Sequence, residues 1–353
     1  MNLTILILSF ERHEELEKKI SYWNYLSSFR YKILIIDGST KPLKVNLKNK
    51  NIKYIHFKSR DYHERIFYSL RFIKTKYIKL ESDDDYFLPY SLNESIQFLN
   101  KNKNYCAVYG QAGIYSIYKN KIFINHIFKI KQNLNSNDFK TRLKIYFSNY
   151  TPKLYYSLMR TSVFKKNVAL WKKSKKIYGQ KFQRFAEIHL PLTLLLNGKI
   201  KVINKLFWIR KDDDIKNRVE FTSNKKILKN DHTYTNISKW FLKNNNLNYF
   251  DNFAINLCKI TRKKILHKDY ILKNILQNYH LKGIRKRMIY NKPAYIFSNF
   301  VKILTPSMLK KIIRFNLKIN GPEILEGKEL KRSFNLNYNV KDIKYLKSVL
   351  LKK

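Results

Sequence analysis

Apolar residues along the first half of the chain follow two different periods. Short, mostly apolar segments, typical of strands, occur at 3–8, 32–36, 52–57, 77–80 and 106–109. Between them, apolar residues spaced three or four positions apart predict helices over 13–27, 62–73 and 91–100. This βαβ rhythm predicts an α/β fold in which helices cover a mostly parallel sheet.

The pattern continues less regularly as far as residue 215. Two strand-like runs between 114 and 128 predict a hairpin, and the next segments predict a helix over 138–147 and a strand over 154–159. A helix over 182–196 contains Pro191, which should kink it or start a second helix, and 201–210 returns to strand character. We therefore expect a first domain over 1–215.

The chain changes character after Asp212-Asp213-Asp214. From there on it is rich in Lys and Asn, and it shows helical spacing with few strand signals. We expect a basic, mainly helical C-terminal region over 225–353.

The bulk composition limits the class of protein. Of 353 residues, 44% are hydrophobic and 15% aromatic, so the chain can bury a sizeable core and is not globally disordered. Lys and Arg number 72 against 25 Asp and Glu, a net charge of +47, which favours polyanionic partners such as nucleic acid, an anionic membrane or phosphate-bearing substrates. Lys, Asn and Ile are abundant throughout, so a solvated basic surface without a partner is the alternative.

Two further features indicate the compartment. The 2 cysteines, Cys106 and Cys258, provide neither a disulfide framework nor a Cys-based zinc site, which is simplest to explain by a reducing compartment. No apolar run approaches the roughly 20 residues of a membrane-spanning helix, and the first run lacks a signal-peptide layout. We expect a cytoplasmic protein, soluble or peripheral on the inner face of the membrane.

Three consecutive aspartates, Asp83, Asp84 and Asp85, close the apolar run at 77–80. Carboxylates this close repel one another unless water or a cation neutralises them. At the carboxyl end of a strand in an α/β sheet they would face the crevice where ligands bind. The triplet therefore favours a site for a divalent metal and a phosphorylated ligand; the alternative is a solvated acidic turn before a helix.

Polar side chains also follow the first two predicted strands. Arg12, at a helix start, suits a phosphate group, and Asp37 suits a base or ribose, although Asp37-Gly38-Ser39 also forms a simple turn. The sequence contains no G-x-G-x-x-G and no Walker-type loop, which counts against dinucleotide and phosphate-loop folds.

Four segments together resemble GT-A glycosyltransferases, especially the family 2-like group. Residues 3–23 resemble the opening strand and helix, with Ser9, Phe10 and Arg12 in the nucleotide-contacting stretch, although Leu8 and Glu11 replace the usual Pro and Asn. ILIIDGS, residues 33–39, resembles the second strand with its nucleotide-contacting aspartate, here Asp37.

The other two segments resemble those that hold the metal-binding motif and the catalytic base in that family. KYIKLESDDDYFLP, residues 76–89, resembles the strand followed by the D-x-D motif, here Asp83 and Asp85. Residues 184–203 resemble the helix with the catalytic acidic residue, here Glu187, which follows Ala186 where the family usually has a second acidic residue.

The resemblance implies an inverting transferase that moves a sugar from a nucleotide-sugar donor to an acceptor in surface-glycan synthesis. The acceptor would be a glycan or a lipid-linked molecule. Mn²⁺ or Mg²⁺, held by Asp83 and Asp85, would neutralise the departing diphosphate, and Asp83 would also reach the ribose. Glu187 would deprotonate the acceptor hydroxyl; an exposed helix residue without a catalytic role is the alternative. Arg210 would contact the diphosphate; a surface arginine is the alternative.

The C-terminal segment 295–318 interleaves aromatic and aliphatic residues with Lys and Arg. Such a basic amphipathic segment can lie on an anionic membrane surface, and the alternative is that it packs on the first domain.

Two other function classes remain open from the sequence. The charge, with 26 Tyr and 23 Phe for base stacking, also suits a nucleic-acid-binding protein, but no binding motif supports it. A metal-dependent phosphoryl-transfer enzyme would use the same aspartates, but it usually needs further ligands that the sequence does not place.

Overall fold

The structure is a computed structural model that describes residues 2–29, 31–118, 121–128, 133–148, 152–178, 186–211 and 340–351. The chain forms two compact units: Met1–Leu143, Thr151–Lys211 and Pro322–Lys353 make the first, and Lys144–Tyr150 with Asp212–Gly321 make the second. Almost all described residues belong to the first unit. The expected boundary at 215–225 and the segment 295–318 lie outside the described residues.

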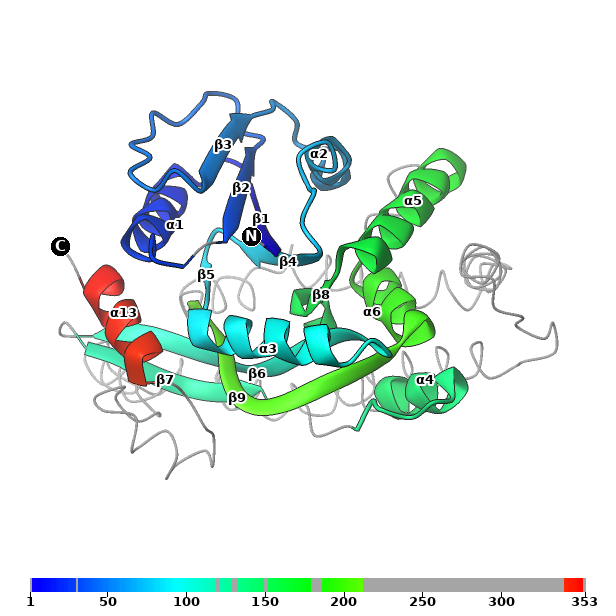
Figure 1. Ribbon diagram of the computed structural model, residues 1–353. Coiled ribbons are helices and arrows are strands. Elements are labelled where there is room, and N and C mark those ends of the chain that lie inside the picture. Colours follow the sequence, from blue (N-terminus) through cyan, green and yellow to red (C-terminus); the bar gives the residue numbers. More distant parts are fainter. Residues whose placement is uncertain are drawn as a thin grey trace, which may run out of the picture. The chain divides into compact units, whose positions relative to one another are not determined.

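Four parallel strands confirm the first part of the predicted sheet. β1 (Leu3–Ser9) pairs with β2 (Lys32–Asp37) and β4 (Tyr77–Ser82), and β2 pairs with β3 (Ile52–His56). Helices lie on both sides of these strands (Figure 1), which explains why nearly every residue of β1 and β4 is buried.

Two helices connect these strands. α1 (His13–Tyr25) buries Leu16, Ile20 and Trp23 at helical spacing. α2 (Tyr62–Ser69) begins after Asp61, whose side chain accepts a hydrogen bond from the backbone N–H of His63 at 2.7 Å, as an N-cap does. The two helices lie on opposite sides of the strands in Figure 1, as right-handed crossovers require when the strand order reverses at β1.

The rest of the nine-stranded sheet is mixed. Its order is β3-β2-β1-β4-β8-β6-β9-β5, with β7 paired to β6. β6 and β9 run parallel, whereas β4–β8, β6–β8, β5–β9 and β6–β7 are antiparallel. The bounds of the added strands are β5 Asp85–Phe87, β6 Tyr105–Tyr118, β7 Lys121–Phe128, β8 Leu158–Arg160 and β9 Lys199–Lys211. The β6–β7 pair confirms the predicted hairpin, and β9 confirms the late strand.

The middle of the chain differs from the prediction in two places. The strand expected over 154–159 is wrong in its first half, where a 3-10 helix (Pro152–Tyr156) precedes β8. α5 (Thr161–Tyr178) was not predicted, although Phe164, Val168 and Trp171 are buried at helical spacing, because lysines interrupt the pattern. The predicted helices around 138–147 and 182–196 are α4 (Phe139–Ser148) and α6 (Ala186–Asn197), and α6 runs through Pro191 as one helix.

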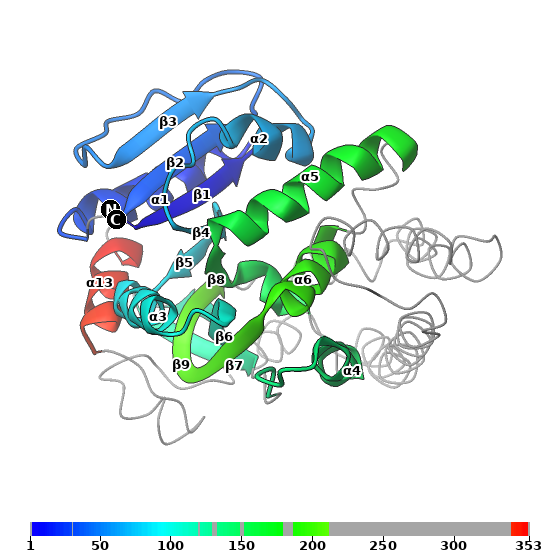
Figure 2. The ribbon, with the colours of Figure 1, turned by 45° about the vertical axis from the view of Figure 1, so that its right-hand side comes forward.

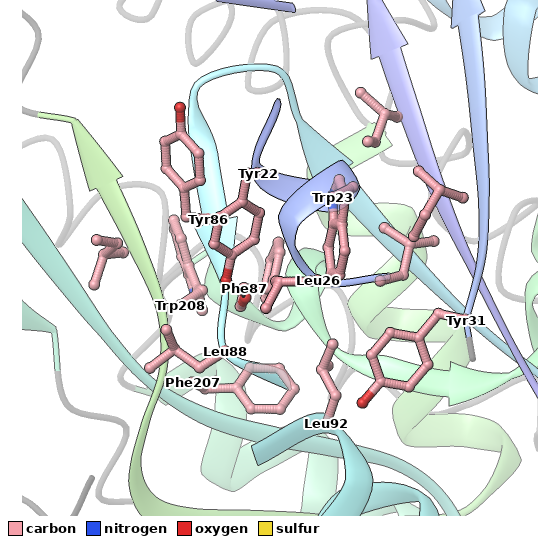
Figure 3. Packing of buried hydrophobic residues seen from close by; sticks show 14 of the residues in the cluster. Tyr22, Trp23, Leu26, Tyr31, Tyr86, Phe87, Leu88, Leu92, Phe207 and Trp208 are labelled. Carbon is pink, nitrogen blue, oxygen red and sulfur yellow. Dashed lines mark hydrogen bonds between the residues drawn. The ribbon is translucent and has the colours of Figure 1, made fainter. Parts of the chain in front are cut away.

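Aromatic side chains fill the core between α1, β5, β9 and α3 (Pro89–Lys101). Figure 3 shows Tyr22 and Trp23 of α1 beside Phe87 of β5, with Phe207 and Trp208 of β9 next to them. The hydroxyl of Tyr22 donates to the backbone carbonyl of Phe87 at 2.6 Å. This contact ties α1 to the strand that begins with Asp85.

The C-terminal helix α13 (Val340–Leu350) packs on α1 and belongs to the first unit (Figure 2). It buries Leu346 and the carboxylate of Asp342. Asp342 accepts a hydrogen bond from the backbone N–H of Tyr90 at 3.2 Å. Because Leu88, the N-cap residue of α3, has no acceptor side chain, Asp342 caps that helix from a distant part of the chain.

Asp342→Asn should flatten the pH dependence of stability. Burial raises the pKa of Asp342 to about 7, so the folded state keeps a proton that the unfolded chain loses near pH 4. Between these values the unfolding free energy of the wild type should fall, relative to the variant, by about 1.4 kcal/mol per pH unit as pH rises. Urea unfolding at several pH values measures this. Parallel curves for the two proteins would contradict it.

Candidate functional site

Polar residues gather where β1, β2 and β4 end. Ser9 lies opposite Asp37 in the β1–β2 register, and Leu8 lies opposite Ser82 in the β1–β4 register. The acidic turn, Asp83–Asp85, begins one residue after Ser82. The three strand ends that the sequence singled out therefore share one edge of the sheet, which is where α/β sheets bind ligands.

Arg12 neutralises the first two aspartates of the acidic turn. Its guanidinium lies 2.9 Å from Asp83 Oδ1 and donates twice to Asp84 Oδ2 at 3.1 Å, while Ser9 Oγ donates to Asp83 Oδ2 at 2.9 Å. Burial raises the pKa of Asp83, and Arg12 offsets this only in part. Burial opposes ionisation of Asp84 too, but Arg12 and Arg210 bring its pKa below the usual value. The structure thus brings Ser9, Arg12 and Asp83 together.

Asp85 has a different environment from its two neighbours. It opens β5, opposite Arg210 of β9, and the Arg210 Nε lies 3.9 Å from Asp85 Oδ1. Its side chain is fully buried, and neither carboxylate oxygen accepts a hydrogen bond from the described residues. Burial raises the pKa of Asp85 to about 8, and the charge of Asp84 adds to that effect.

Asp37 organises the end of β2. Its Oδ1 accepts from the backbone N–H and the hydroxyl of Ser39 at 3.0 and 2.5 Å, and its Oδ2 accepts from the Tyr54 hydroxyl at 2.7 Å. His13 lies 3.6 Å from Oδ2 and is about one-third exposed. With three donors already on the buried Asp37 carboxylate, partly exposed neighbours such as His13 are the more accessible groups at this strand end.

Two residues outside the predicted site set, Arg65 and Glu11, also shape this edge. Arg65 of α2 is buried, donates to the backbone carbonyl of Ser9 and lies 5.7 Å from the Phe10 ring. A side chain at Gly38 would collide with Arg65 and with the Ser59 carbonyl, so this position requires glycine. Glu11 has a φ of 53°, in the left-handed region, and its carboxylate accepts from the N–H and hydroxyl of Thr40 at 2.7 Å. Helical spacing alone marks neither Arg65 nor Glu11.

The other predicted site residues are Phe10, Arg210 and Glu187. Phe10 is half-buried directly after β1. Arg210 is partly exposed near the end of β9 and pairs with Asp85. Glu187 lies in the first turn of α6, and its side chain is outside the described part of the structure.

The acidic turn has the donor chemistry for a hard divalent cation. Mg²⁺ and Mn²⁺ prefer oxygen ligands, and Mg²⁺ is commonly bound through one or two carboxylates together with substrate phosphates. The two oxygens of Asp85 and Asp84 Oδ1 are buried without a hydrogen-bond donor among the described residues. A cation reaching Asp83 would compete with Arg12. The described part of the chain contains no group of three or more His, Cys, Asp or Glu side chains suited to a metal, so substrate phosphates would have to complete the coordination.

Comparisons with known proteins give structural likenesses only. No family model and no curated protein matches the chain. Similar solved structures include the 1–349 fragment of S. aureus TarS in complex with UDP-GlcNAc, at TM-score 0.46 and 14% identity, covering 99% of this chain and 90% of that one. The same fragment with UDP gives TM-score 0.43 and 12% identity, with the same coverage. A third structure of the fragment gives 0.44 and 11%, covering 79% and 80%. Similarity at this level carries no inference about function.

Proposed function

We propose that this chain is a glycosyltransferase that moves a sugar from a nucleotide-sugar donor, with Mn²⁺ or Mg²⁺ as cofactor and inversion at the anomeric carbon. The observation that carries the proposal is the arrangement at one sheet edge of Ser9, Arg12, Asp37 and the acidic turn. A nucleotide with a charged diphosphate has the chemistry that suits this set. Its base and ribose would lie near Asp37 and Phe10, and its phosphates near Arg12 and Arg210.

The chain's own residues would bind and orient the donor. Asp83 and Asp85 would hold the cation, which when bound supplies positive charge to the leaving diphosphate. Arg12 and Arg210 would add fixed positive charges beside the same phosphates. Ser9 would keep Asp83 in place through its 2.9 Å hydrogen bond. Glu187 would accept the proton of the acceptor hydroxyl as that oxygen attacks the sugar.

A thermal-shift panel tests the donor site. Nucleoside diphosphates and sugar nucleotides should raise the melting temperature of the full chain with Mn²⁺ present, and much less with a chelator, because ligands that bind the native state stabilise it by mass action. No shift with any nucleotide would overturn the proposal. Metal-dependent cleavage of plain nucleic acid or phosphate esters would instead favour a phosphoryl-transfer enzyme. Binding to DNA or RNA that falls steeply with salt would favour a nucleic-acid-binding protein.

The acceptor side of the proposal is a surface glycan or its lipid-linked precursor, reached from the cytoplasmic face of a membrane. Among the described helices, none has the length and apolar character to cross a membrane. Contact with the membrane would come from the basic segment 295–318.

Charge removal in this segment should release the chain from vesicles. We expect the wild type to bind vesicles that contain anionic lipid, and to bind less as salt rises, since exposed charges are screened within about 10 Å at roughly 0.1 M salt. Replacing Lys302, Lys310, Lys311 and Arg314 should abolish the binding, because each basic residue near the surface contributes about 1 kcal/mol. Sedimentation with vesicles measures this. If the wild type does not bind anionic vesicles, the membrane part of the proposal is wrong.

A further inference from the structure

A buried ion pair lies beneath the acidic turn. Lys19 Nζ of α1 lies 2.9 Å from Glu81 Oε1 of β4, and both side chains are fully buried. A buried charge pair is costly to desolvate and is weak evidence for stability. Neither residue is predicted to contact the ligand, so the ion pair needs an explanation other than ligand binding.

Glu81 joins the two strands on either side of the acidic turn. It lies two residues before Asp83, and its Oε1 also accepts from the backbone N–H of Phe87, two residues after Asp85, at 3.2 Å. Its Oε2 accepts from Trp23 Nε1 at 3.1 Å. One carboxylate therefore closes the base of the turn and fixes it to α1.

Lys19 brings a positive charge to the same place. Its Nζ lies 4.1 Å from the centre of the ring of Tyr86, the residue that follows Asp85 in the sequence. Lys19 thus places a buried positive charge beside the turn from the α1 side, while the partly exposed Arg12 lies against the carboxylates of Asp83 and Asp84.

We propose that Lys19 and Glu81 are positioning residues, which hold the acidic turn in the geometry that binds the cation and the donor diphosphate without contacting either. This inference rests on the proposed function. α1 and its N-cap residue Arg12 would act on the turn at three points: Arg12 on its carboxylates, Lys19 through Glu81, and Tyr22 on the Phe87 carbonyl. Groups that orient metal ligands in this way typically change metal affinity by about 10- to 100-fold when removed.

The test is the double substitution Lys19→Met with Glu81→Gln in the full chain. It removes both members of the ion pair together, so neither Lys19 nor Glu81 is left as a buried charge without the other, and the amide oxygen of the substituted side chain can still accept from the Phe87 N–H. The probe is UDP or GDP, whichever stabilises the wild type more, and the measurement is the Mn²⁺ concentration that gives half of the thermal stabilisation. We expect this concentration to rise about 10- to 100-fold. Leu99→Ala, which truncates a buried side chain of α3, is the destabilising control and should leave it within about twofold.

A second measurement needs no metal. Amide exchange over 82–87 in the ligand-free chain should be faster in the double variant than in Leu99→Ala, since the turn loses the Lys19–Glu81 contact with α1. If the double variant does not fold, Trp23→Phe removes only the donor to Glu81 Oε2 and should shift Mn²⁺ dependence in the same direction by a smaller factor. If Mn²⁺ stabilises the wild type and the double variant at the same concentrations, the positioning role of Lys19 and Glu81 is overturned, but the proposed donor site is not. A wild type without any response would overturn the proposed donor site as well.

Discussion

Asp85→Asn should abolish the Mn²⁺-dependent stabilisation of the chain by a nucleoside diphosphate. At a ligand concentration of about 100 times Kd, the wild type should gain about 2.7 kcal/mol, and the variant should lose almost all of this gain. The ligand-free variant should be at least as stable as the wild type. It no longer buries a carboxylate beside Asp84, and the two oxygens of that carboxylate accept no hydrogen bond from the described residues.

Asp342→Asn is the matched control for this prediction. It makes the same chemical change at another buried aspartate with a raised pKa, in α13 rather than in the acidic turn. Thermal shifts with and without Mn²⁺ should separate the two variants, and only Asp85→Asn should lose the metal response. If Asp85→Asn binds nucleotide and Mn²⁺ as well as the wild type, the metal assignment is wrong.

Glu187→Gln should lower the rate of sugar transfer by about 100- to 10,000-fold, because it keeps the shape of the side chain and removes its ability to accept a proton. Donor binding should change little, so the loss should appear in kcat and not in the donor Kd. Glu94→Gln, at an exposed carboxylate of α3 that pairs with Lys205 at 2.7 Å, is the control and should retain full activity. Substantial turnover by Glu187→Gln would mean that another group is the base.

Local sequence patterns predicted the strands of the N-terminal, parallel part of the sheet. β1, β2 and β4 are short runs buried on both faces, and the acidic turn follows β4 directly, so their positions could be read from the chain alone. β5 could not be predicted in this way. It has three residues, and it becomes a strand only because β9, more than a hundred positions later in the chain, pairs with it.

The candidate site could be predicted only in part for the same reason. Ser9, Arg12 and Asp83 each follow a predicted strand within a few residues, and the parallel register brings them together. The roles of Lys19 and Glu81 depend on how α1 packs against β4. In the sequence, Glu81 is one more residue of a strand, and Lys19 is one of many lysines. The capping of α3 by Asp342 likewise joins segments 252 positions apart.

The most direct test of the donor site is hydrogen exchange on the full chain, with Mn²⁺ and a saturating amount of the nucleoside diphosphate that stabilises it most. The account predicts slower exchange in four segments: 9–13, 37–40, 62–66 and 82–87. These contain the ends of β1 and β2, the start of α2 with Arg65, and the acidic turn. Bound nucleotide that leaves all four segments unchanged, or protects only other parts of the chain, would contradict it.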